Sequence, residues 1–147
     1  MKKIESVALI ILSSLLLTPI LVHAESSPNM IKYAKLYADS TGITHFKDEQ
    51  ISFGEPNADG ARFTPLTLAT QVGHLLLPVN FKADWHPAPR KQWIFVLTGT
   101  VEVEAQDGEI RQLSSGSIAF VEDTIGKGHQ TRNVGDEPVL IAWVPVD

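Results

Sequence analysis

From residue 43 onward the sequence is a succession of short segments rich in branched, threonine and aromatic residues, with turn residues between them. The expected strands are residues 43–53, 63–79, 93–105, 110–113, 117–121 and 139–146. Many short segments of this kind in one chain are typical of a β-sandwich or β-barrel. Only residues 30–38 could form a short helix, and their tyrosines fit a strand equally well. We therefore predict an all-β fold.

The sharpest local signal is a β-hairpin. Residues 101–105 alternate between apolar and charged side chains, Asp107-Gly108 follows, and residues 109–113 run back. Asp-Gly tolerates the positive φ angles of a tight turn, so this dipeptide sets the register of the hairpin. Residues 139–146 are almost continuously apolar, which predicts a strand covered on both sides.

The N-terminal residues 1–24 have the pattern of a signal peptide. Two lysines precede an apolar run that ends at Val22-His23-Ala24, a small-residue cleavage site. An uncleaved membrane anchor is the alternative, but the run is short and contains serine, threonine and proline. We expect cleavage after Ala24, export to the periplasm or the exterior, and a single domain in residues 25–147. Because the chain has no cysteine, it can form no disulfide in an oxidising compartment.

Composition excludes several classes of function. The net charge is −5, with no run of like charges, so the chain has no electrostatic reason to bind nucleic acid or, after cleavage, a membrane surface. Without cysteine or a G-x-S-x-G segment there is no centre for covalent hydrolysis. The glycine patterns of Rossmann and P-loop sites are also missing. A small-molecule ligand is the expected partner.

Two motifs in the C-terminal half carry most of the functional signal. The first reads DWHPAPRKQWIFVLTG and runs from Asp84 to Gly99. The second begins at Gly116 and continues through Thr124, Gly126, His129 and Asn133. In this order, with the hairpin between them, the motifs resemble those of the cupin superfamily over roughly residues 73–146. The resemblance implies a small jelly-roll β-barrel.

The same resemblance implies a candidate metal site. His86 takes the first histidine position of the first motif, Gln92 takes the glutamate position, and His129 takes the histidine of the second motif. Ala88 stands where the family has a further histidine. A typical metal-binding cupin supplies three imidazoles and one carboxylate, whereas this chain supplies two imidazoles and a carboxamide. The ion implied by the family is iron, zinc, manganese or nickel.

Strand alternation gives an independent argument for the same group. Gln92 faces the same side as His86 if the chain stays extended between them, and a buried amide needs partners. His74 shares its strand parity with Val72 and Leu76, so it either lines the same cavity as a third imidazole or is a core histidine.

Nearby polar residues allow a second, metal-free chemistry. Glu122 and Asp123 form an adjacent carboxylate pair, for which a solvated turn is favoured over general base work. Gly126 and Gly128 indicate a turn with positive φ. In the metal-free version, His86 or His129 is the acid-base group and one of the two carboxylates orients it.

Three functions remain open. The first is a metal-assisted oxidoreductase or isomerase, which the sequence favours over the second, a metal-free enzyme similar to the sugar-epimerase-like cupins. The third is a non-enzymatic binding or sensing module, so the sequence leaves open whether the protein is an enzyme. A homodimer is also expected, because Trp93, Phe95 and Trp143 lie in strands and offer more apolar area than one core needs.

Overall fold

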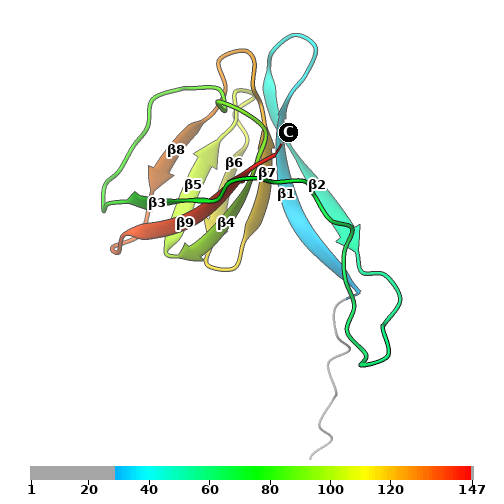
Figure 1. Cartoon of the computed structure of the whole chain (residues 1–147). Coiled ribbons are helices and arrows are strands. Elements are labelled where there is room, and N and C mark those ends of the chain that lie inside the picture. The colour runs from blue at the N-terminus through cyan, green and yellow to red at the C-terminus, as the bar shows by residue number, and fades with distance from the viewer. Residues whose placement is uncertain (1–28, 147) are drawn as a thin grey trace, which may run out of the picture.

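The computed structural model describes residues 29–146, which form nine β-strands and no helix (Figure 1). The strands are β1 (Met30–Ala38), β2 (Thr44–Ser52), β3 (Gly73–Leu77), β4 (Gln92–Thr98), β5 (Thr100–Glu104), β6 (Ile110–Ser114), β7 (Ile118–Glu122), β8 (Gln130–Asn133) and β9 (Val139–Pro145). Within this part of the chain, no helix is long and apolar enough to cross a membrane. The expected signal peptide lies outside the described residues.

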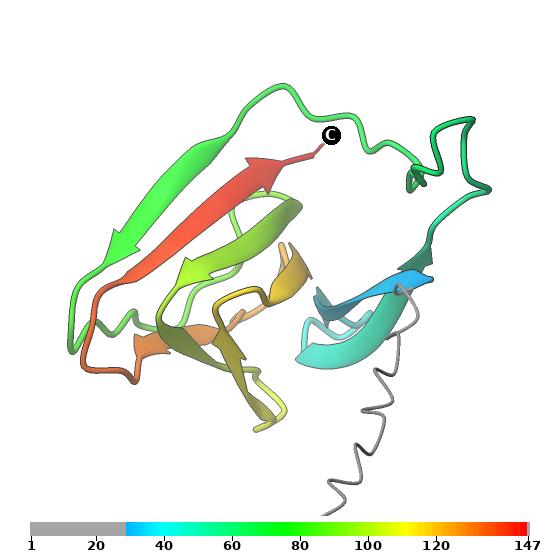
Figure 2. The same ribbon diagram turned by 90° about the horizontal axis from the view of Figure 1, so that it is seen from below.

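The strands form two sheets that face each other as the walls of an open barrel (Figure 2). The larger sheet has the order β2-β1-β7-β4-β9-β3, and the smaller one has the order β6-β5-β8. All neighbouring strands are antiparallel except β1 and β7, which are parallel. The expected all-β jelly-roll architecture is confirmed.

The connection between β3 and β4 ties the two sheets together. It leaves the edge of the larger sheet and runs along β8, where isolated bridges join Lys82 to Arg132 and His86 to His129. The Ala83 amide also donates to the Thr131 carbonyl at 2.8 Å. This crossing places the first sequence motif against the second.

Alternation along the strands separates an inner face from an outer face. Leu36, Val96 and Ile141 of the larger sheet point inward and are almost fully buried. Val101 of the smaller sheet also points inward and is buried. Each such side chain stabilises the fold by about 1.5–3 kcal/mol, which lets the barrel hold together without a disulfide.

The three residues behind the dimer expectation do not share a face. Trp93 and Phe95 alternate with the cavity-lining residues Gln92 and Ile94, so they lie on the outer face of the larger sheet. Trp143 lies on the inner face, where its indole fills the space above Gly73. Only the first two therefore offer apolar area to a partner.

Most expected strands are present, with two differences. Gly99, with φ of 76°, divides the expected strand 93–105 into β4 and β5. The expected strand 63–79 is wrong over residues 63–72, which have no neighbouring strand to pair with; only Gly73–Leu77 pairs, with β9. The hairpin is confirmed, with Gly108 at φ of 93°. Residues 30–38 form a strand.

Candidate functional site

A cavity of about 160 Å³ lies between the two sheets. Its walls are mainly aliphatic and aromatic, and its polar lining side chains are His86, Gln92, His129 and Thr131. Small-molecule sites commonly combine an apolar wall with a few converging polar groups. His86, Gln92 and His129 therefore line one cavity, although the chain bends between His86 and Gln92 and does not stay extended there.

His86 and His129 are direct cross-strand neighbours. Each amide donates to the other residue's carbonyl at 3.0 Å, and the two ring centroids are 4.7 Å apart. Gly128 permits this approach, because it has φ of 79° and a methyl group there would overlap the His86 carbonyl. Gly126, with φ of 78°, approaches the Gly42 backbone in the same way. Both glycines occupy the positive-φ turn expected from the sequence.

Asp123 holds the His129 ring. Its Oδ2 atom lies 2.7 Å from His129 Nδ1, and the carboxylate is fully buried. The Thr44 hydroxyl, also buried, donates to the same oxygen at 3.5 Å. When Asp123 is ionised, Nδ1 carries the proton, which leaves Nε2 as the ring atom with a free lone pair. Nothing in the sequence around Thr44 signalled its contact with Asp123.

The expectation of a solvated turn is wrong for Asp123. The Ala88 amide donates to its carbonyl at 3.1 Å, and this pairing keeps its side chain inside the barrel. Glu122 points the other way and forms ion pairs with Lys35 at 2.7 Å and Lys91 at 3.5 Å. Of the two carboxylates, Asp123 alone contacts a candidate site residue.

His86 is fixed differently. Its Nδ1 atom donates to the Asp84 carbonyl at 2.8 Å. A carbonyl oxygen only accepts, so Nδ1 must carry a proton and Nε2 of the neutral ring is an acceptor. His86 is exposed whereas His129 is buried, so the pair runs from the solvent to the interior.

Gln92 has an unsatisfied polar atom. Its Oε1 is buried and has no hydrogen-bond partner within residues 29–146. An unpaired buried oxygen costs about 1–3 kcal/mol, which a ligand that donates a hydrogen bond would offset. With the two Nε2 atoms, this oxygen gives the cavity three acceptors.

His74 does not join the site. Leu75 and Leu77 of β3 line the cavity, and His74 alternates with them and is exposed on the outer face. The sequence correctly predicts that His74 and Leu76 share a face of the strand, but that face lies away from the cavity. His74 is therefore neither a third imidazole of the site nor a core histidine.

His45 lies near the surface, away from the cavity, and contacts two carboxylates. Its Nδ1 lies 2.7 Å from Asp107 Oδ2, and its Nε2 lies 3.2 Å from Asp39 Oδ2. The hydrogen bond with Asp107, followed by that with Asp39, raises the pKa of His45 above its ordinary value of 6.5. Hydrogen bonding from Thr41 is the main cause that lowers the pKa of Asp39.

The comparisons with known proteins agree with the β-barrel fold. The family model described as "Cupin domain" matches residues 73–145. The chain belongs to the cupin superfamily. No curated protein matches it.

Several solved structures are similar to this cupin. One is an uncharacterized conserved protein with a double-stranded β-helix domain from Klebsiella pneumoniae, at 25% identity over 54% of this chain and 70% of that chain, with a TM-score of 0.44. Another is a cupin domain from Bordetella pertussis, at 17% identity over 64% and 97% of the two chains, with a TM-score of 0.43. A third is the cupin domain of Schizosaccharomyces pombe Cnp3, at 14% identity over 82% and 86%, with a TM-score of 0.43. Cupins include enzymes and non-enzymatic binding modules, so membership does not select a reaction.

Many cupins hold a metal ion, but the residues of this cavity do not fit a resident divalent cation. The described residues contain no group of three or more His, Cys, Asp or Glu side chains that could hold one. His86, Gln92 and His129 supply only neutral donors, which bring no charge to offset the loss of the ion's waters. The nearest buried carboxylate, Asp123, is already bonded to His129. The metal-assisted reaction favoured by the sequence therefore loses its main support.

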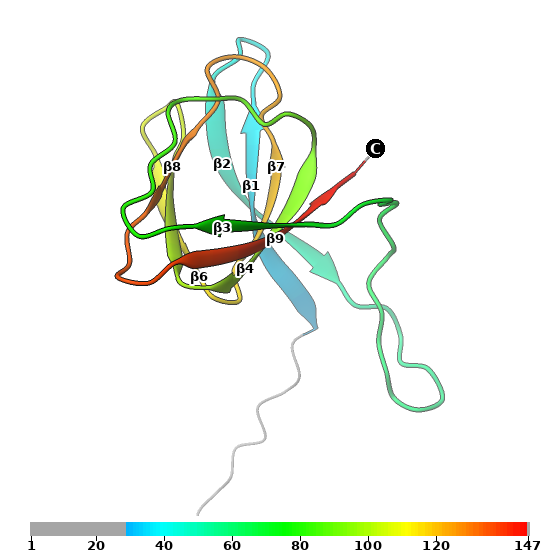
Figure 3. The same ribbon diagram turned by 60° about the vertical axis from the view of Figure 1, so that its left-hand side comes forward.

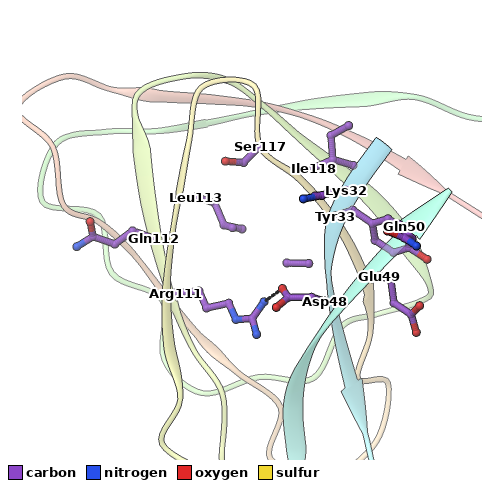
Figure 4. Close-up of a pocket in the computed structure, with 11 residues that line it drawn as sticks. Lys32, Tyr33, Asp48, Glu49, Gln50, Arg111, Gln112, Leu113, Ser117 and Ile118 are labelled. Atoms are coloured by element: carbon purple, nitrogen blue, oxygen red, sulfur yellow. Dashed lines mark hydrogen bonds and ion pairs between the residues drawn. The ribbon is translucent and has the colours of Figure 1, made fainter. Parts of the chain in front are cut away.

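A larger groove of about 760 Å³ lies elsewhere on this cupin, between the β1–β2 hairpin and β6 (Figure 4). Its floor carries Arg111, which pairs with Asp48 at 2.5 Å and lies over the Phe46 ring. Glu49, which also lines the groove, pairs with Lys47, and none of the candidate site residues lines it. The smaller cavity is the better candidate site, because the two motifs converge there.

Proposed function

We propose that the barrel binds a small, mainly apolar molecule and that His129, oriented by Asp123, exchanges a proton with it. The observation that carries this proposal is the buried Asp123–His129 pair in the wall of an apolar cavity. Carboxylate–imidazole pairs of this kind supply general bases in enzymes.

The chemistry of the pair supports this role. Asp123 keeps the proton on Nδ1 of His129, so Nε2 can accept a proton from the ligand. The buried carboxylate then stabilises the imidazolium that forms. Returning the same proton to another atom of the ligand would isomerise it without a co-reactant, which is the simplest reaction for such a site.

His86 and Gln92 give the site its expected specificity. Both offer acceptor atoms, so the preferred ligand carries hydroxyl or amine donors on an otherwise apolar body. The exposed position of His86 also gives it contact with solvent, through which a proton can leave the site.

Hydrogen–deuterium exchange tests the proposal without knowledge of the natural substrate. Small hydroxy-aldehydes and hydroxy-ketones with an exchangeable hydrogen next to the carbonyl are incubated with the protein in D₂O, and proton NMR follows the label. We expect exchange by the wild type and its loss in His129→Gln. His74→Gln is the matched control and should behave like the wild type, because His74 lies outside the cavity.

Two results would replace the proposal. A wild type that binds members of this panel but exchanges none of them would indicate a non-enzymatic binding module, which the mainly apolar cavity would also suit. Stoichiometric metal in untagged protein, lost in both His86→Ala and His129→Ala, would restore a metal-assisted function with Gln92 as the third donor.

Export also remains a proposal. The basic start, apolar run and small-residue site of residues 1–24 motivate it. Mass spectrometry of protein from the periplasmic fraction should give a chain that begins at Glu25. Recovery of the chain with residues 1–24 still attached would argue for a membrane anchor instead.

A further inference from the structure

The segment from Phe63 to Phe81 has an unusual surface composition. It contains no Lys, Arg, Asp or Glu, although charged residues make up 20% of the chain. Among residues 29–146, eleven large hydrophobic side chains are exposed, and seven of them lie in this segment: Phe63, Leu66, Leu68, Val72, Leu75, Leu76 and Val79. Leu66 is 98% exposed. Apolar side chains gathered in this way usually mark an interaction surface.

The backbone of the same segment is also unpaired. Residues 64–72 have no regular secondary structure and make no hydrogen bond within the described part of the chain. β3 follows them directly and, among residues 29–146, pairs only with β9, so no described strand covers its other edge (Figure 3). An edge of this length is usually protected by charged side chains or a bulge. Here only Pro65 and Pro78 limit it, one at each end.

Strand parity places the apolar side chains on one face. His74 and Leu76 lie on the outer face of β3, and Leu66, Leu68 and Val72 have the same parity in the sequence. Pairing of the segment with a further strand would therefore extend β3 into a longer strand with a leucine-rich outer face.

We infer that residues 66–76 pair antiparallel with the same residues of a second copy of this chain, across a two-fold axis. A register that sets Leu66 opposite Leu76 also sets Leu68 opposite His74 and Thr70 opposite Val72, so every one of these pairs includes an apolar side chain. The chain has a net charge of −5, but this segment is uncharged, so two copies can approach there without repulsion. The pairing does not depend on the cavity or on its proposed function.

Light scattering during size-exclusion chromatography, at high micromolar concentration, tests the inference. We expect a dimer for the purified wild type. The double variant Leu66→Lys/Leu76→Lys should give half that mass, because it places charges face to face. Ile110→Lys on β6 is the matched control, since Ile110 is 49% exposed outside the segment, and it should stay dimeric.

A second variant separates backbone pairing from simple apolar contact. Thr67→Pro/Thr70→Pro removes two amide donors of opposite strand parity, so one of them faces the partner strand, and it keeps every leucine. It should also be monomeric, and circular dichroism should show the β-spectrum of the wild type.

Several results would overturn the inference. A monomeric wild type would do so, whether or not it binds lipid vesicles. So would a dimer that survives both the lysine and the proline variants. A dimer lost only in Phe95→Lys would place the interface on the outer face of β4 instead.

Discussion

Two histidine–carboxylate pairs of this cupin have the same Nδ1–Oδ2 distance but different surroundings. His129 and Asp123 lie 2.7 Å apart in the barrel wall, where Asp123 is fully buried. His45 and Asp107 also lie 2.7 Å apart, but on the surface where the β1–β2 hairpin meets the β5–β6 turn. Around the first pair the backbone is tightly packed, whereas around the second it is open to solvent.

The difference shows that burial, and not distance, decides what such a pair can do. At the surface, water screens the charges and competes for the hydrogen bonds, so the pair contributes little beyond a local link. In the wall, Asp123 has few alternatives to His129, so it fixes one orientation and one tautomer of the ring. Each region also contains a glycine with positive φ, Gly128 in the wall and Gly108 at the surface. Each contains a glutamine with an unpaired buried oxygen as well, so matched substitutions can be made in the two regions.

The largest expected effect is that of Gly128→Ala. Gly128 and Gly108 both have positive φ, so alanine costs about 1–2 kcal/mol at either position. At Gly128 the added methyl group also overlaps the His86 carbonyl, whereas nothing lies within 4 Å at Gly108. Urea unfolding should show a loss of about 3 kcal/mol or more for Gly128→Ala. Equal losses at the two positions would contradict the close packing of the wall.

Asp123→Asn should destabilise the protein by about 2 kcal/mol, because it removes a charge-assisted hydrogen bond and buries an amide that lacks acceptors. Asp107→Asn should cost less than about 0.5 kcal/mol, because that pair is exposed. Asp123→Asn should also lower the deuterium-exchange rate about 10²-fold or more. An unchanged rate in this variant would remove Asp123 from the proposed mechanism.

Gln92→Met tests whether the site keeps an unsatisfied oxygen for its ligand. The substitution removes the buried unpaired Oε1 of Gln92 and should stabilise the protein by about 1 kcal/mol while weakening ligand binding. Gln106 also has an unpaired buried Oε1, but it does not line the cavity. Gln106→Met should therefore stabilise the protein without affecting binding. Weaker binding in both variants would indicate a general loss of structure.

The smallest effect is the pH dependence of the surface pair. The pKa of His45 is raised in the folded state, mainly by its hydrogen bond with Asp107. Its contribution to stability is therefore fully present below the unfolded-state pKa and is lost as the pH rises through the higher folded-state pKa. The stability difference between wild type and His45→Gln should shrink from about pH 5.5 to about pH 9. NMR titration of the His45 ring gives the folded-state pKa directly.

The sequence by itself determined much of the fold and part of the site. Periodicity located most strands, and Asp107-Gly108 located the hairpin, because these signals depend on residues close together in the chain. The spacing of the two motifs predicted that His86, Gln92 and His129 converge, and all three line the cavity.

Tertiary structure alone decided the role of Asp123. A carboxylate beside Glu122 reads as a solvated turn, and only the contacts with Thr44 and Ala88, from distant parts of the chain, bury it beside His129. The sequence also did not determine which face of β3 points inward. Alternation places His74 and Leu76 on the same face, but it does not say which face the second sheet covers. The sequence of residues 64–72 is typical of a strand, yet a strand forms only where a neighbour supplies hydrogen bonds, and no strand within residues 29–146 pairs with them.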